Sequence, residues 1–244
     1  GGGEPLICVP VVEQDAQSVI REITYLSQST ADMIEWRVDA FRDFTDYNAI
    51  RSVFEAVAPL LGEKLFLYTF RTAHQGGMAQ VKAEQLDDLH DLAAESGCVD
   101  LVDLEFFEED RPLHKIKRLR EMGVSVIASH HDFEQTPSPE VMKMLLEKMC
   151  AGGADIVKLA VMPQNYKDVL NLLDVTAQFR EENPDTPVIT MSMGSLGGIS
   201  RISGETFGSC VTFGAHEKSS APGQFAMKEL RQMLDTIHAS SQIQ

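Results

Sequence analysis

Positive charge is scarce in this sequence. Its 244 residues include 21 lysines and arginines against 37 aspartates and glutamates, which gives a formal net charge of −16. Phosphate backbones and anionic bilayers would repel so acidic a protein, so we expect no nucleic acid and no membrane among its partners. The same scarcity makes any local cluster of arginine and lysine more informative.

Cysteine is also rare, and no apolar run approaches the roughly 20 residues that cross a bilayer. The four cysteines, at positions 8, 98, 150 and 210, lie far apart in the chain. This spacing favours free thiols in a reducing compartment over a disulfide framework or a zinc site. No signal peptide is visible, and we therefore expect a cytoplasmic protein.

Strand-like and helix-like stretches alternate along the chain. The expected strands are 6–12, 32–39, 64–71, 101–107, 124–131, 154–162, 187–193 and 209–215. The expected helices lie near 15–28, 47–60, 80–95, 111–122, 138–151, 165–181, 197–206 and 223–239. Eight such pairs predict an α/β protein made of one (β/α)8 TIM barrel, a single catalytic domain over 1–244. A doubly wound open sheet is the alternative, but no glycine-rich fingerprint follows the first strand.

Polar side chains fall on the inward face of five consecutive expected strands. Side chains alternate between the two faces of a strand, so parity separates the barrel interior from the surface that faces the helices. The inward polar set is Glu35, Arg37, Asp39, Thr69, Arg71, Asp103, Glu105, Ser129, His131 and Lys158. Most lie toward the carboxyl ends of their strands, where barrel enzymes build active sites. One such residue alone could form a structural ion pair, but five converging strands favour an active site.

Lys158 is the only cation in the strand-like run 154–162. An ammonium is costly to bury unless it is paired or loses its proton, and a neutral amine can attack a ketone to form a Schiff base. An isolated strand lysine would more often reach solvent or pair with an acid. Together with His131, a base near neutral pH, it suits removal of a proton α to an imine. Arg37, Arg71 and Arg201 would gather an anionic or hydroxylated substrate.

Metal and phosphate chemistry are not predicted. The seven histidines include no HExxH pattern, and the adjacent His130 and His131 point to opposite faces of a strand, a poor spacing for chelation. The glycine-rich run 193–199 is typical of a turn before a short helix and resembles a phosphate loop only weakly. We therefore expect no metal and no cofactor.

These residues lie in segments that together resemble the type I 3-dehydroquinate dehydratases, over nearly the whole chain. The segments are EWRVD at 35–39, FRT at 70–72, HDF at 131–133 with TP at 136–137, KLAVMP at 158–163, MSM at 191–193, ISR at 199–201, GSCVTFG at 208–214 and SAPGQ at 220–224. The resemblance implies a metal-free, cytoplasmic barrel, commonly a homodimer. Such a lyase converts 3-dehydroquinate to 3-dehydroshikimate by syn elimination of water, in the shikimate pathway of aromatic amino acid biosynthesis.

The resemblance also assigns roles. It makes Lys158 the imine-forming nucleophile and His131 the general base and acid, which removes the C2 proton and helps the C1 hydroxyl to leave. The remaining assignments are Arg201, Ser220 and Gln224 for the substrate carboxylate, Glu35, Arg37 and Arg71 for the ring hydroxyls, and Met191, Met193 and Phe213 for the pocket wall. On spacing alone, Met193 and Phe213 could equally be core residues, and Ser220 and Gln224 a turn before a helix.

Two positions depart from the family pattern. Gln75 stands before Gly76 and Gly77 where the family usually has an acidic residue, believed to orient the catalytic histidine. An amide can hydrogen-bond an imidazole but cannot stabilise an imidazolium by charge. Pro10 falls where relatives often carry a small polar residue, so it receives no role.

Two other functions remain open. A Schiff-base aldolase of the same fold would need a phosphate grip in the late loops, and residues 220–223 offer no glycine-rich cradle. A catalytically silent binding barrel would have to keep Lys158 and His131 facing inward at a cost in stability.

Overall fold

The structure, a computed structural model, describes residues 3–242, and residues 1–2 and 243–244 of the predicted 1–244 domain lie outside the described part. Neighbouring strands pair in parallel in the order β7-β6-β5-β4-β3-β2-β1-β8-β9. The strands are β1 Leu6–Val11, β2 Met33–Arg37, β3 Leu65–Thr69, β4 Leu101–Glu105, β5 Ser125–Asp132, β6 Ile156–Val161, β7 Val188–Ser192, β8 Val211–Ala215 and the short β9 Phe225–Ala226. A parallel bridge between Val188 and Ser209 brings the two ends of the curled sheet together, which confirms the predicted barrel.

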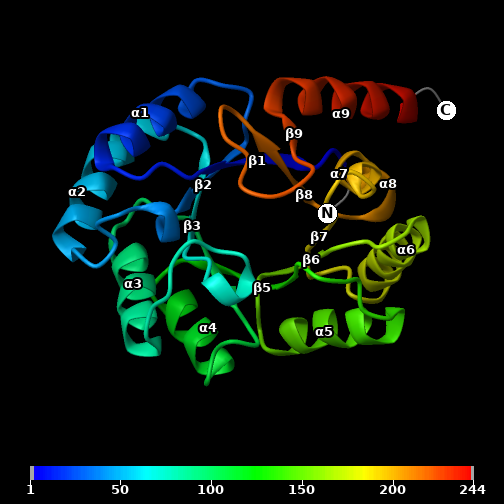
Figure 1. Cartoon of the computed structure of the whole chain (residues 1–244), viewed down its shortest axis with the longest axis horizontal. Coiled ribbons are helices and arrows are strands. Elements are labelled where there is room, and N and C mark those ends of the chain that lie inside the picture. Colours follow the sequence, from blue (N-terminus) through cyan, green and yellow to red (C-terminus); the bar gives the residue numbers. More distant parts are fainter. Residues whose placement is uncertain (1–2, 243–244) are drawn as a thin grey trace.

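The helices form a ring around the strands (Figure 1). They are α1 Ala16–Ser27, α2 Tyr47–Val57, α3 Ala83–Glu95, α4 Pro112–Glu121, α5 Pro139–Ala151, α6 Tyr166–Glu182, α7 Gly198–Ile202, α8 Gly204–Phe207 and α9 Met227–Ser241, with 3₁₀ turns at Val38–Ala40, Ala58–Leu60 and Ala73–Gln75. Between residues 3 and 242, none of the helices combines the length and apolarity needed to span a membrane.

Several element boundaries differ from the prediction by a few residues, and three of the differences arise at turns. The helix expected near 197–206 is two short helices, which meet at Ser203 and Gly204. The last helix begins at Met227 rather than near 223, because Phe225 and Ala226 first pair with β8 as a short strand. The second strand ends at Arg37, and the chain then turns through a 3₁₀ turn. The sequence pattern did not distinguish these turns from the elements beside them.

The core has two layers that follow strand parity. Outward side chains such as Trp36, Tyr68 and Leu104 pack beneath the helices in the larger cluster. Inward side chains near the amino ends of the strands, among them Met33, Leu67 and Ile127, form a separate apolar plug inside the barrel. This plug seals the amino-terminal half of the barrel, so the inward polar residues gather above it at the carboxyl ends. That is the arrangement predicted from parity.

Candidate active site

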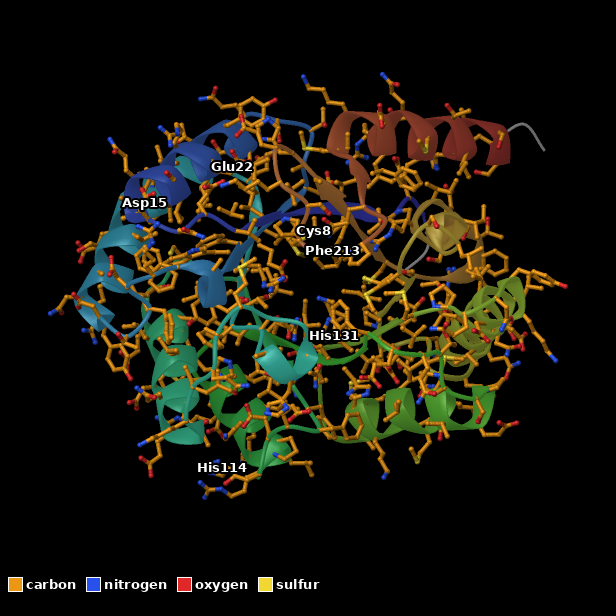
Figure 2. The ribbon with its side chains drawn as sticks, in the orientation of Figure 1. Cys8, Asp15, Glu22, His114, His131 and Phe213 are labelled. Carbon is orange, nitrogen blue, oxygen red and sulfur yellow. The ribbon has the colours of Figure 1, made fainter. Side chains whose placement is uncertain are left out.

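A narrow cavity lies at the carboxyl ends of the strands. It is lined by Glu35, Arg37, Arg71, Gln75, Gly76, His131, Phe133, Lys158, Ala160, Met191, Met193, Phe213, Ser220, Ala221 and Gln224. Every predicted site residue except Arg201 is among them. In Figure 2, His131 and Phe213 lie toward the barrel centre, whereas Asp15, Glu22 and His114 lie at the periphery. The cavity measures about 40 Å³, which is room for a few water molecules.

Lys158 stands at the middle of β6 with its side chain inside the barrel. Only 3% of the residue is exposed. Its Nζ lies 3.3 Å from Oδ2 of Asp103 and 4.4 Å from the centre of the Phe213 ring. The lysine is therefore buried as predicted, and a carboxylate and an aromatic face hold the amine in place.

Arg71 lies at the centre of a buried network. Nη2 lies 2.9 Å from Oδ2 of Asp103, and Nη1 donates to Glu105 at 2.9 Å and to Ser129 at 3.1 Å. Thr72 adds two bonds to Glu105, from its backbone N–H at 2.9 Å and its hydroxyl at 2.6 Å. Burial alone would lower the pKa of Arg71, but Asp103 and Glu105 outweigh burial and raise it. This guanidinium is a fixed cation, and much of its donor capacity is already used within the protein.

The second strand contributes a matching pair of polar groups. Nε and Nη2 of Arg37 each donate at 2.8 Å to Asp39, whose oxygens also accept the backbone N–H groups of Arg71 and Met78. Glu35 is 2% exposed and accepts the Thr69 hydroxyl at 2.8 Å. The two inward side chains of this strand thus present an anion and a cation to the cavity.

His131 is held by Gln75. The Gln75 oxygen Oε1 accepts the backbone N–H of His131 at 2.9 Å and lies 3.0 Å from its Nδ1. The Phe133 ring stacks on the imidazole with an interplanar angle of 17°. Burial, then the charges of Arg71 and Lys158, lowers the pKa of His131 well below its ordinary value. The imidazole is therefore neutral at neutral pH, the state that a general base requires.

Two glycines bring Gln75 into this position. Gly76 adopts a left-handed backbone with φ +82°, and a Cβ there would lie 2.4 Å from the Phe133 ring. A Cβ on Gly77 would lie 1.8 Å from the carbonyl oxygen of Arg71. Only glycine fits at either position, and the close turn places the preceding amide over His131.

Arg201 lies beside the cavity rather than on its wall. The residue is 1% exposed, and its Nη2 donates to the carbonyl of Pro222 at 3.0 Å. Its Nε and Nη1 are buried and find no acceptor among the described residues. Burial lowers the pKa of Arg201 to about 10, so it remains a cation at neutral pH. Donors left unpaired in a buried guanidinium suit an anionic ligand that arrives from outside.

The loop above Arg201 carries the other predicted carboxylate ligands. Ser220 and Gln224 bond each other twice, from the Ser220 backbone N–H to Oε1 at 2.9 Å and from Nε2 to the Ser220 hydroxyl at 3.0 Å. Pro222 also accepts the Gly194 N–H at 3.2 Å, which ties this loop to the turn after β7. The loop therefore covers the cavity, and its polar groups are satisfied within the loop.

Two site residues were not singled out from the sequence. Asp103 was recognised only as an inward carboxylate, although it contacts Lys158 directly. Phe133 shares the parity of His131, and that spacing could have placed it on the cavity wall. Within residues 3–242, no group of three or more histidines, cysteines or acids is arranged to hold a metal ion.

A family model and curated relatives match this chain over nearly its full length. The family model described as "Type I 3-dehydroquinase" matches residues 7–241. A 3-dehydroquinate dehydratase of Syntrophotalea carbinolica is 42% identical over 239 residues, covering 98% of this chain and 94% of the relative.

Solved structures show the same fold. The type I 3-dehydroquinate dehydratase of Clostridium difficile, described with covalently modified comenic acid, has a TM-score of 0.94 at 39% identity and covers 98% of this chain and 95% of its own. That of Geobacillus kaustophilus has a TM-score of 0.95 at 36% identity, with coverages of 99% and 94%. With a family model over almost its entire length and relatives above 40% identity, this chain belongs to the type I 3-dehydroquinase family of enzymes.

Proposed function

We propose that this enzyme dehydrates 3-dehydroquinate to 3-dehydroshikimate through a Schiff base on Lys158, as a step of the shikimate pathway. The observation that carries the proposal is the shared cavity of Lys158 and His131, a buried amine and a neutral imidazole on adjacent strands. The names of the relatives supply the substrate. The covalent modification described for the Clostridium difficile structure is in keeping with a nucleophile in this fold.

The first step joins the amine to the ketone. The nitrogen lone pair of Lys158 forms the new bond to carbon, and the carbonyl oxygen leaves as water after gaining two protons. An ammonium and a ketone thus become a protonated imine and water, with no change in total charge. The cationic imine then accepts electrons from the neighbouring carbon–hydrogen bond.

His131 performs the proton transfers. Its free ring nitrogen removes the proton from C2, and the electron pair of that bond moves toward the imine to give an enamine. The enamine expels the C1 hydroxyl, which takes the proton back from His131 and departs as water. Hydrolysis of the imine then releases product and restores the amine. One base therefore serves both proton transfers, which syn elimination allows because the proton and the hydroxyl leave from the same face.

Substrate binding would use the remaining polar groups. Arg201 would bond the substrate carboxylate through the two donors that lack acceptors within the protein. Ser220 and Gln224 would exchange their mutual bonds for the same carboxylate. Glu35, Arg37 and Arg71 would contact the hydroxyls, and Met191, Met193 and Phe213 would wall the ring. The loop residues Ser220, Ala221 and Gln224 line the cavity together with these groups.

The domain organisation, the compartment and the oligomeric state are inferred from the family. We propose that residues 1–244 act as one catalytic domain in a cytoplasmic homodimer, with no metal or cofactor. Gel filtration with light scattering would test the dimer, which predicts twice the 27.0 kDa chain mass.

One assay tests the reaction and its mechanism together. Product formation from 3-dehydroquinate is followed by the absorbance of the conjugated enone, and sodium borohydride is then added with substrate to reduce the imine. We expect turnover, inactivation by borohydride, and a single adduct on the peptide that contains Lys158. Lys158→Met should show neither turnover nor adduct. An adduct on another peptide, or turnover that survives borohydride without an adduct, would refute the covalent mechanism.

A further inference from the structure

We propose that Asp103 is a positioning residue for Lys158. It holds the amine at the site of attack and acts as the fixed counter-ion of the imine nitrogen. The inference rests on the proposed function, because it concerns the nitrogen that would carry the Schiff base.

The contacts of Asp103 leave it little freedom. It is 1% exposed in the middle of the barrel. Oδ1 accepts the Ser129 hydroxyl at 2.6 Å, while Oδ2 lies 2.9 Å from Nη2 of Arg71 and 3.3 Å from Nζ of Lys158. The residue stands on β4, and its three partners come from β5, from the segment just after β3 and from β6. Four segments of the barrel wall therefore fix this carboxylate and, through it, the lysine amine.

Asp103 is a permanent anion. Burial alone would raise its pKa, but the charges of Arg71 and Lys158 outweigh burial and hold the pKa well below its usual range. It therefore cannot exchange protons with substrate near neutral pH, which excludes it as a general acid or base. What it supplies is a negative charge beside Nζ.

The other inward carboxylates serve different partners. Asp39 binds Arg37 through both oxygens, and Glu105 binds Arg71 and Thr72. Among residues 3–242, Asp103 is the carboxylate that forms an ion pair with Lys158. Each of these three carboxylates therefore has its own set of partners. Asp103, the one beside the nucleophile, is the least exposed of the three.

The reaction requires a counter-ion at this point. The nitrogen is cationic as an ammonium and cationic again as the protonated imine, whereas it is neutral during attack and in the enamine. A fixed anion 3.3 Å away favours both cationic states over neutral ones. It therefore keeps the imine protonated, which makes the imine able to accept electrons when the C2 proton leaves. The same anion slows attack at low pH by favouring the ammonium.

A purely structural role would give a different result. Asp103 also anchors Arg71, so its loss could harm the enzyme simply by releasing that guanidinium. Glu105 is the matched control, because it lies two residues further on the same strand and face and binds Arg71 at 2.9 Å. Among residues 3–242, the ion pair of Lys158 is with Asp103 and not with Glu105. Comparing Asp103→Asn with Glu105→Gln separates support of Arg71 from an effect on the amine.

The measurement is the rate of borohydride-trapped adduct formation against pH, with steady-state turnover alongside. For Asp103→Asn we expect the acidic limb of adduct formation to move lower by about one pH unit or more, because the ammonium has lost its counter-ion. Turnover at neutral pH should fall about tenfold or more, because the imine loses its proton more readily. Glu105→Gln should lose turnover, whereas the acidic limb of its pH profile for adduct formation should stay near that of the wild type.

Each remaining outcome decides the inference. An acidic limb in Asp103→Asn that coincides with those of Glu105→Gln and the wild type would overturn it. If Asp103→Asn does not fold by circular dichroism, Ser129→Ala serves instead, since it removes the 2.6 Å bond to Oδ1 and leaves the carboxylate held only through Oδ2, by Arg71 and Lys158. A smaller shift in the same direction supports the inference, and no shift overturns it. If the wild type itself forms neither product nor adduct, the proposed function has failed rather than the role of Asp103.

Discussion

A single oxygen atom of Gln75 faces two nitrogen atoms of His131, the backbone nitrogen at 2.9 Å and Nδ1 at 3.0 Å. A backbone N–H can only donate, so the atom that it meets must be the amide oxygen. Since the same oxygen faces Nδ1, that ring nitrogen must carry the hydrogen. The lone pair is thereby left on Nε2, which makes Nε2 the basic atom of His131.

Replacing Gln75 by glutamate should raise the pH at which His131 becomes an active base. The carboxylate would add a negative charge beside Nδ1 and favour the imidazolium, so the pKa of the histidine would rise. A base whose pKa rises is protonated over more of the acidic range, and the acidic limb of the turnover profile should move to higher pH. Steady-state rates between pH 5 and 9 would measure the shift.

The rate at neutral pH carries further information. A faster Gln75→Glu enzyme would mean that the base had been too weak, and a slower one that protonation had become limiting. Glu108→Gln is the control, because Glu108 accepts the Gln75 amide at 3.3 Å without touching the imidazole, and its variant should shift the limb less. If the limb of Gln75→Glu does not move, the contact seen between Gln75 and His131 has no bearing on the titration.

Removing the imidazole should separate imine formation from elimination. His131→Ala should lower turnover roughly a hundredfold or more, as loss of a general base does, while borohydride still traps an adduct on Lys158. His130→Ala is the neighbouring control. His130 meets Phe107 edge-on, at a centroid distance of 5.4 Å, on the opposite face of β5. Near-native turnover in His131→Ala together with a loss in His130→Ala would transfer the role to His130.

Parity explains why so much of the site was accessible from sequence. Alternation along a strand fixes the face on which a side chain lies, so Lys158 and His131 could be placed inside the barrel without knowing any distance. The same argument placed Asp103 inside but not beside Lys158. That contact depends on the stagger of β4, β5 and β6 and on side-chain rotamers, which a period-two pattern does not encode.

Arg201 shows a second limit. It lies in a five-residue helix and is held by the carbonyl of Pro222, which is 21 residues further along the chain. A contact between so short a helix and a loop leaves no periodic signal in the sequence. Its charge indicated only a contact with an anionic or hydroxylated substrate, and the family resemblance assigned it to the carboxylate. The structure adds the unpaired donors that suit this role.

Arg201 should determine affinity for the substrate carboxylate. Bonds between charged partners contribute about 1.5–3 kcal/mol, so Arg201→Ala should raise KM roughly ten- to a hundredfold, and Arg201→Lys should recover only part of the loss. An analogue without the carboxylate distinguishes binding from folding. The Ala variant should bind the analogue and the substrate equally, and the assignment fails if it discriminates between them as the wild type does.

His90, far from the chemistry, should make the fold sensitive to acid. It lies on α3 and is 3% exposed, with its ring edge-on to Tyr68, and its Nε2 has no partner among residues 3–242. Burial lowers its pKa to about 4, whereas an unfolded chain would titrate near 6.5. Between these two pKa values, His90 binds a proton in the unfolded state but not in the folded state. The free energy of unfolding therefore falls as pH drops from about 6.5 toward 4.

The size of this effect is open to measurement. A difference of about 2.5 pH units corresponds to roughly 3 kcal/mol when fully expressed below pH 4. His90→Phe keeps a flat ring and removes the titration, so its urea midpoint should change less than that of the wild type between pH 7 and pH 4.5. His238→Gln is a control with the opposite pH dependence. The hydrogen bond to Glu205 raises the pKa of His238, so protonation of this histidine stabilises the fold at low pH rather than at high pH. Parallel losses of stability in wild type and His90→Phe would mean that acid acts on another buried group.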